Sequence, residues 1–152
     1  MTTASTTTRT RDAAELASRL RVSVWRAARR MRRESDPGVT PTLHAALITL
    51  EIHGPMTAGQ LAVHENVRKP TMTRTIQALV DRDLARRTPD PLDGRVTWLA
   101  ITTEGSKLLQ RTRRRTDEFL AKRLGSLSAE ERAVLSRASD LLETIAEKDP
   151  GT

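Results

Sequence analysis

The hydrophobic pattern of the chain is typical of a mainly helical protein. From Asp12 to about Arg33, apolar side chains recur at helical spacing and form one stripe, which consists of Leu16, Leu20, Val24, Ala27, Ala28 and Met31. Asp36-Pro37-Gly38 then predicts a linker. Thr40 and Pro41 supply the cap and the first-turn proline of a second helix, which we expect to end at His53.

The C-terminal part of the chain predicts two further helices. Thr102 can cap a long helix that runs to about Leu124, and Ser128-Ala129-Glu130-Glu131 is a capping box that begins the last one. The last helix carries a wide apolar stripe, which consists of Val134, Leu135, Ala138, Leu141, Leu142 and Ile145. Such a stripe predicts, together with the first helix, a two-fold interface between two copies of the chain. The alternative is that the stripe packs wholly within its own subunit.

Between these regions the pattern predicts two short helices in succession. Thr57-Ala58-Gly59-Gln60 forms a capping box, and Pro70 lies in the first turn of the next helix, where its missing N–H costs nothing. In that second helix Met72, Ile76, Leu79 and Val80 form the inward stripe. The opposite face carries Arg68, Lys69, Thr71, Thr73, Arg74 and Gln77.

These polar residue types suit the major groove of DNA. Arg and Lys donate to guanine, Gln pairs with adenine, and Thr reaches a phosphate or the thymine methyl group. A recognition helix presents its N-terminal turns to the bases. The alternative is an ordinary amphipathic helix with a solvated face, but its position after a capped helix and a tight turn favours DNA recognition.

A β-hairpin is predicted after these helices. Residues 84–88 and 96–101 read as strands, and Asp93-Gly94 between them is a strong turn signal. An Arg just past such a turn, Arg95, would lie near the hairpin tip and could enter the negative minor groove. Asp93 either orients the guanidinium of Arg95 or serves only the turn, and spacing alone does not decide between these roles.

Three segments together resemble the signature of the MarR family of bacterial transcription regulators. They are Thr71-Met72-Thr73-Arg74, Asp93-Gly94-Arg95, and Leu99 to Gly105. The resemblance implies a homodimeric winged helix-turn-helix regulator, either a repressor or an activator, of which we expect a repressor. It also implies a wing Arg on DNA and a nearby Asp that orients it. It supports these roles for Arg95 and Asp93. Asp83 stands where the family usually has Gly, and Asp tolerates the left-handed conformation that such a turn needs.

The fold class we predict is therefore mainly α with a small β-hairpin wing. We expect one MarR-like domain over residues 12–147, with dimerisation helices over 12–35 and 103–147 and the winged helix-turn-helix over 41–102. The segments 1–11, which we expect to be disordered, and 148–152 are predicted to be tails.

Composition agrees with a partner that is double-stranded DNA. Lys and Arg outnumber Asp and Glu by 26 to 19, which gives a formal charge of +7 and favours polyanions. An architectural protein that coats DNA with little sequence preference is the alternative function. No stretch approaches the roughly 18 apolar residues of a membrane span. We expect a cytoplasmic bacterial protein, associated with the nucleoid and not with a membrane.

Other site chemistry is weakly indicated. The absence of Cys excludes thiol redox sensing and thiolate metal ligation, and we expect no cofactor and no enzymatic activity. His44 and Glu51 could share a helix face, but two ligands do not make a metal site. The family resemblance implies a small aromatic or anionic effector, for which Trp25, Arg26 and His44 are the candidate residues, although the sequence favours plain packing for Trp25 and an ordinary helix position for His44.

Overall fold

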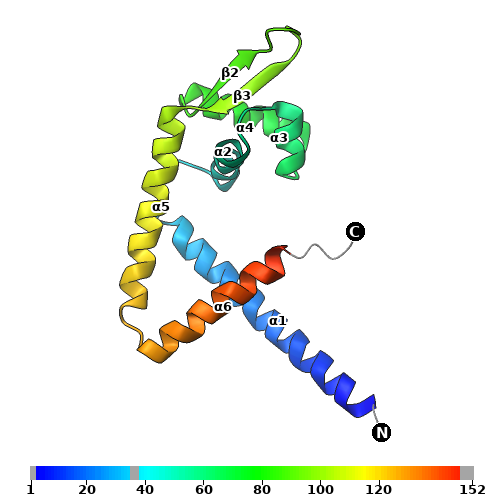
Figure 1. The fold of residues 1–152 in the computed structure, drawn as a ribbon, viewed down its shortest axis with the longest axis vertical. Coiled ribbons are helices and arrows are strands. Elements are labelled where there is room, and N and C mark those ends of the chain that lie inside the picture. The colour runs from blue at the N-terminus through cyan, green and yellow to red at the C-terminus, as the bar shows by residue number, and fades with distance from the viewer. Residues whose placement is uncertain (1–2, 35–37, 148–152) are drawn as a thin grey trace. The chain divides into compact units, whose positions relative to one another are not determined.

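The computed structural model describes residues 3–34 and 38–147. Its helices are α1 (Thr3–Arg32), α2 (Pro41–His53), α3 (Ala58–His64), α4 (Lys69–Asp81), α5 (Thr103–Leu124) and α6 (Ala129–Glu147) (Figure 1). Its strands are β1 (Met56–Thr57), β2 (Ala85–Pro89) and β3 (Thr97–Ile101). The predicted fold class, mainly helical with a small hairpin wing, is confirmed.

Local capping explains where several helices begin. The Thr57 hydroxyl accepts the Gln60 N–H at 3.3 Å, and the Gln60 side chain accepts the Thr57 N–H at 2.8 Å, so both halves of the predicted capping box form. Ser128 and Glu131 form the same reciprocal pair at the start of α6. Because these bonds join residues three apart, they were readable from sequence spacing alone.

A small antiparallel sheet holds the wing. The strand order is β1-β3-β2, with Thr88 opposite Trp98 and Met56 opposite Leu99. Strand β1 is absent from our sequence predictions, because a two-residue strand has no periodicity of its own. It exists through its pairing with β3, whose residues are far away in the sequence.

The core lies under the helix-turn-helix. Its fully buried side chains come from α2, α3, α4, β3 and α5 and are Leu47, Leu50, Leu61, Met72, Leu79, Leu99 and Leu109. Among the predicted inward residues of α4, Met72, Ile76 and Leu79 are buried and Val80 is half-buried. Helix α4 is therefore anchored along one face, and its other face is left for a partner.

Hydrogen bonds fix the two connections of the wing, from α4 into β2 and from β3 into α5. Asp83 has φ 54°, the left-handed conformation that the sequence predicts for a position usually occupied by Gly. Its carbonyl accepts the Thr102 hydroxyl at 2.6 Å, and that hydroxyl oxygen accepts the Gly105 N–H at 3.0 Å as the cap of α5. One threonine therefore fastens the start of α5 to the turn after α4.

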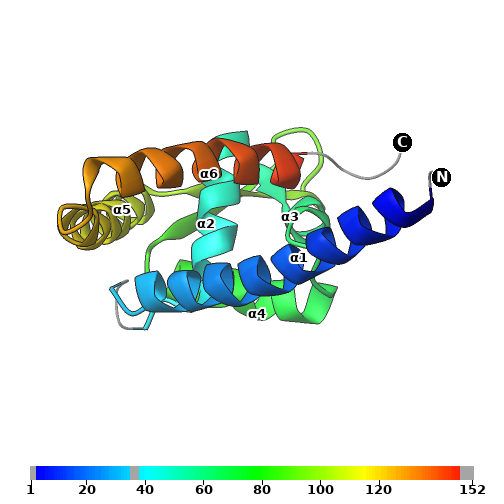
Figure 2. The same ribbon diagram turned by 90° about the horizontal axis from the view of Figure 1, so that it is seen from below.

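Two predicted boundaries differ from the structure. Helix α1 begins at Thr3, so residues 3–11 are helical where the sequence predicts a tail; Figure 2 shows α1 as one unbroken helix. The physical reason is that a helix nucleated downstream extends at little cost per added residue. Where one domain was expected over residues 12–147, the chain forms two compact units, Met1–Thr116 and Asp117–Thr152. Residues 1–2 and the tail predicted over 148–152 lie outside the described residues.

Apolar side chains of the outer helices are left uncovered. In α1, Leu16 and Trp25 are more than half exposed, and in α6 the same is true of Val134, Leu141 and Ile145. No residue of α6 with a described side chain is buried. The predicted stripes exist, but the described part of this chain does not cover them.

Candidate nucleic-acid interface

The polar face predicted for the recognition helix is exposed in the structure. Six side chains lie on the uncovered surface at the start and along one face of α4: Arg68, Lys69, Thr71, Thr73, Arg74 and Gln77. Among the described residues, the charged ends of Lys69 and Arg74 enter no ion pair, whereas the Thr73 hydroxyl donates to the Lys69 carbonyl at 3.0 Å. The cations of this face are therefore available for an external anion.

Gln77 is held in a network that spacing did not reveal. Its amide nitrogen donates to Asp81 at 2.6 Å, and its amide oxygen accepts from the Arg87 guanidinium at 3.1 Å. Arg87 lies on β2, so this network joins the recognition helix to the wing. The amide nitrogen and oxygen of Gln77 each make one bond within the protein, and each keeps one further N–H or lone pair with which to pair a base.

Asp90 organises the loop between β2 and β3, a role that the sequence reading missed. One carboxylate oxygen accepts the backbone N–H groups of Leu92 and Asp93 at 2.8 and 3.0 Å. The other accepts the indole N–H of Trp98 at 2.7 Å. The signal was present as an Asp before Pro, which commonly caps a turn, but the Trp98 contact crosses the hairpin.

The environment of Asp90 favours its charged form. The hydrogen bond from Trp98, followed by those from the Leu92 and Asp93 amides, lowers the pKa of the Asp90 carboxyl below its ordinary value. A lowered pKa means that these bonds stabilise the wing loop above the ordinary carboxyl value near 3.8 and are lost as the pH falls through the lower value in the folded state.

We therefore expect the indole N–H resonance of Trp98 to keep its chemical shift between pH 7 and about pH 5 and to move only in stronger acid. A heteronuclear NMR titration measures this directly. The Trp25 indole serves as the internal reference, and Asp90→Ala identifies the signal. A Trp98 transition centred near pH 6 would contradict the assigned hydrogen bond.

The two wing residues singled out from the sequence are both exposed at the tip. Asp93 accepts the backbone N–H of Arg95 at 3.0 Å. Among the described residues, no hydrogen bond or ion pair joins the Asp93 carboxylate to the Arg95 guanidinium. The structure therefore has the hydrogen bond of the turn, and the orienting role of Asp93 on the Arg95 guanidinium stays a prediction.

The three candidate effector residues are not brought together. His44 lines a pocket of about 330 Å³ with Arg32, Val39, Pro41, Ala45 and Ile48. Trp25 and Arg26 are exposed on α1 and do not line it; the Arg29 guanidinium lies 5.4 Å from the Trp25 ring centroid. Burial, and then the charge of Arg113, lower the pKa of His44, so its imidazole is neutral near pH 7. Its buried Nε2 has no partner among the described residues.

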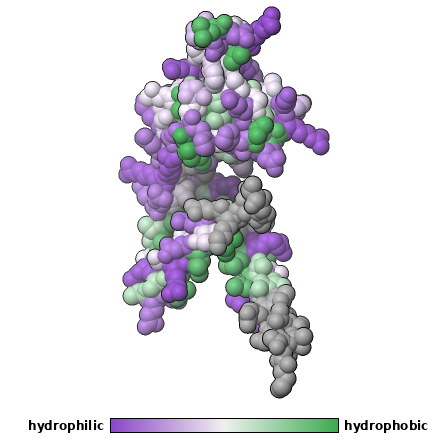
Figure 3. All heavy atoms as spheres, turned by 45° about the vertical axis from the view of Figure 1, so that its right-hand side comes forward, coloured by the Kyte–Doolittle hydropathy of each residue, from purple (hydrophilic) through white to green (hydrophobic). Residues whose placement is uncertain are grey.

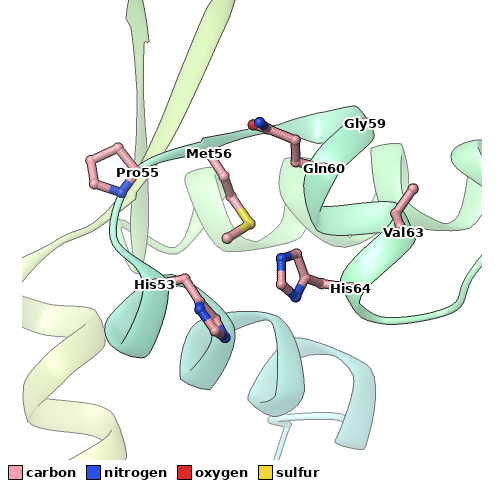
Figure 4. Close-up of a pocket in the computed structure, with 7 residues that line it drawn as sticks. All are labelled: His53, Pro55, Met56, Gly59, Gln60, Val63 and His64. Atoms are coloured by element: carbon pink, nitrogen blue, oxygen red, sulfur yellow. The ribbon is translucent and has the colours of Figure 1, made fainter. Parts of the chain in front are cut away.

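A second pocket, of about 480 Å³, lies where α2 and α3 end. Figure 4 shows His53, His64 and Met56 around it, with the two imidazole rings facing each other at a centroid distance of 4.7 Å. Glu51, weighed from the sequence as a partner of His44, instead pairs with Arg113. The described residues contain no group of three or more His, Cys, Asp or Glu side chains that could hold a metal ion. None of the described helices is long and apolar enough to cross a membrane.

Comparison with known proteins agrees with this geometry. The sequence model of the MarR family matches residues 39–97. The chain is 39% identical to an uncharacterised HTH-type transcriptional regulator of Mycobacterium bovis over 90% of this chain and 96% of that protein. It is 29% identical to the HTH-type transcriptional repressor NicR of Pseudomonas putida over 66% and 63% of the two chains. A crystal structure of a transcriptional regulator from Pseudomonas aeruginosa superimposes with a TM-score of 0.81 at 28% identity, over 90% and 98%.

Proposed function

Because this chain belongs to the MarR family of transcriptional regulators, we propose that it acts as a homodimeric repressor on a near-palindromic operator. The observation that carries the proposal is the exposed Arg and Thr face of α4, which lies beside a wing with a preorganised tip. Repression is the activity named for NicR, the relative from Pseudomonas putida. A repressor that binds operator DNA would act at the nucleoid, in the cytoplasm.

The dimer is supported by the uncovered apolar surface of the outer helices. Val134, Leu141 and Ile145 of α6 are 68%, 57% and 65% exposed, and Figure 3 shows patches of hydrophobic surface among hydrophilic side chains. Apolar surface of this extent on a small protein marks an interface. A two-fold dimer would hold two α4 helices about 34 Å apart, so the half-sites would lie one helical turn apart.

The pocket beside His44 supports control by a small ligand. Its lining combines apolar walls, the Arg32 cation and a neutral imidazole with a buried, unpartnered nitrogen. This chemistry suits a small aromatic acid, whose ring would contact Val39 and Ile48 and whose carboxylate would contact Arg32. Such a ligand would release DNA if it favoured dimers whose α4 helices are wrongly spaced.

Fluorescence anisotropy at near-physiological salt tests the proposed function. The probe is DNA from upstream of the protein's own gene, and the reference is a scrambled duplex of equal length. We expect a preference of about a thousandfold or more for the specific site. If the upstream duplex bound no more tightly than the scrambled duplex, and footprinting found no protected site elsewhere, the architectural alternative would be favoured.

We expect Arg74→Ala to weaken operator binding by about 1 to 3 kcal/mol per half-site and to relax selectivity at particular base pairs, because a forked donor to guanine is lost. The matched control is Arg86→Ala, which removes an exposed cation from β2. The control should weaken operator and scrambled duplex by the same factor, as a phosphate contact does. Equal losses for Arg74→Ala on both duplexes would contradict its assignment to base reading.

A further inference from the structure

A leucine stands almost wholly in solvent at the tip of the wing. Leu92 is 97% exposed, the largest exposure among the large hydrophobic residues described. Figure 3 shows hydrophobic surface beside hydrophilic side chains at this tip, the uppermost part of the molecule in that view. Single exposed leucines are common on protein surfaces, so exposure alone decides nothing. Leu92 differs from such residues because hydrogen bonds hold the backbone that carries it.

The backbone that carries Leu92 is held in place. Its own N–H donates to the Asp90 carboxylate at 2.8 Å, and Pro91 before it has a locked φ. The loop is closed by two further bonds, from the Asp90 N–H to the Val96 carbonyl and from the Val96 N–H to the Asp93 carbonyl, each 2.9 Å long. A side chain presented on such a loop loses little freedom when it binds, so little affinity is lost to ordering.

Arg95 belongs to the same loop and is also exposed. The tip therefore presents two chemistries together: a cation, which suits the negative potential of a narrow minor groove, and a branched apolar group. Minor-groove proteins use apolar wedges of this kind, Leu among them, to open a base-pair step and kink the duplex.

We propose that Leu92 is an apolar wedge that reads the flexibility of a base-pair step in the minor groove under the wing. The inference rests on the proposed function and deepens it by naming the class of DNA. The wing site is an A·T-rich segment with a TA step, because pyrimidine–purine steps unstack most easily and A·T pairs give a narrow groove. The Arg95 cation is attracted by the negative potential of the narrow groove, and Leu92 inserts only where the base-pair step opens readily.

The experiment uses the full chain and two operators that differ only at the step under the wing, located by footprinting. One carries TA and the other AA, so the A·T content and the charge contacts are unchanged while the stiffness of the step differs. Affinity is measured by anisotropy, and bending by energy transfer between dyes at the duplex ends. Leu92→Ser is compared with Leu92→Met, which keeps an apolar side chain, and with Ile52→Ser, which removes a 67% exposed apolar residue from α2.

We expect the wild type to bind and bend the TA operator more strongly than the AA operator. Leu92→Ser should lower the affinity for the TA operator by about tenfold, because it removes the free energy gained by partly burying one leucine. Its affinity for the AA operator should fall much less. Leu92→Met should restore the difference, and Ile52→Ser should behave as the wild type. Because Leu92 makes no side-chain contact that the fold needs, its variants should unfold at the wild-type temperature.

Two results would overturn the wedge while leaving the proposed function intact. In one, Leu92→Ser binds and bends both operators as the wild type does. In the other, it loses affinity equally on both, which would make Leu92 a contact without step preference. A wild type that fails to prefer the operator to a scrambled duplex would instead contradict the proposed function, and the wedge with it.

Discussion

Gly105→Ala is expected to lower the free energy of unfolding by about 3 kcal/mol, the upper end of the cost of overpacking. A Cβ at this position would lie 2.2 Å from the Leu84 carbonyl oxygen and 2.7 Å from Cγ1 of Ile101. The Leu84 carbonyl accepts the Thr102 N–H at 3.1 Å and belongs to buried backbone. Since the nearer clash is with backbone, no side-chain rotation relieves it, and the joint between the sheet and α5 must move.

Urea denaturation followed by circular dichroism measures this loss. Gly94→Ala is the matched control, because no heavy atom lies within 4 Å of the Cβ it would add. Its stability should stay within about 0.5 kcal/mol of the wild type, as for most surface substitutions. If both alanine variants unfolded at the same urea concentration, the close approach of Leu84 to Gly105 would not exist in solution.

Charging the apolar face of α6 is expected to abolish tight operator binding. In the double variant Leu141→Asp with Ile145→Asp, carboxylates replace two side chains that are 57% and 65% exposed. Each subunit should still fold, because neither residue contributes to the core. The dimer should not form, because burying these carboxylates without partners is costly. Two half-sites bound by one dimer gain about 100- to 10,000-fold over a single one, and that factor should be lost.

Size-exclusion chromatography with light scattering gives the oligomeric state, and anisotropy on the same samples gives the affinity. Ser136→Asp with Ser139→Asp adds the same charge to the polar side of α6 and should leave both unchanged. If the variant with both Leu141→Asp and Ile145→Asp remained dimeric, the interface would have to lie elsewhere on the chain. A wild type that is monomeric at micromolar concentration would remove the dimer from the proposed function.

Much of the helix-turn-helix was predictable because its determinants are local. The Thr57–Gln60 capping box, Pro70 in the first turn of α4, and the spacing of Met72, Ile76 and Leu79 all lie within one or two helical turns. Helical geometry alone then places Thr71 and Arg74 on the opposite, exposed face. The left-handed turn at Asp83 was instead suggested by the family resemblance, which has Gly at this position, and Asp tolerates that conformation.

The organisation of the wing was less predictable because its bonds cross between segments. Asp90 meets Trp98 across the hairpin, and Arg87 meets Gln77 across the junction between β2 and α4. The first pair depends on strand register and the second on how α4 packs beside β2, and the sequence reading gave no reason to join either. For Asp93 the spacing left two roles open, and only the structure shows that its carboxylate accepts the backbone N–H of Arg95.

Apart from the start of α1, the sequence by itself determined the helices, their caps, the position of the hairpin and the polar face of α4, because each depends on residues a few positions apart. Tertiary structure decided which groups meet: the Asp90 network, the pairing of β1 with β3, the need for glycine at position 105, and the separation of Trp25 from the pocket beside His44. These contacts join distant segments whose distances are set by packing of the whole core. No local pattern encodes such distances.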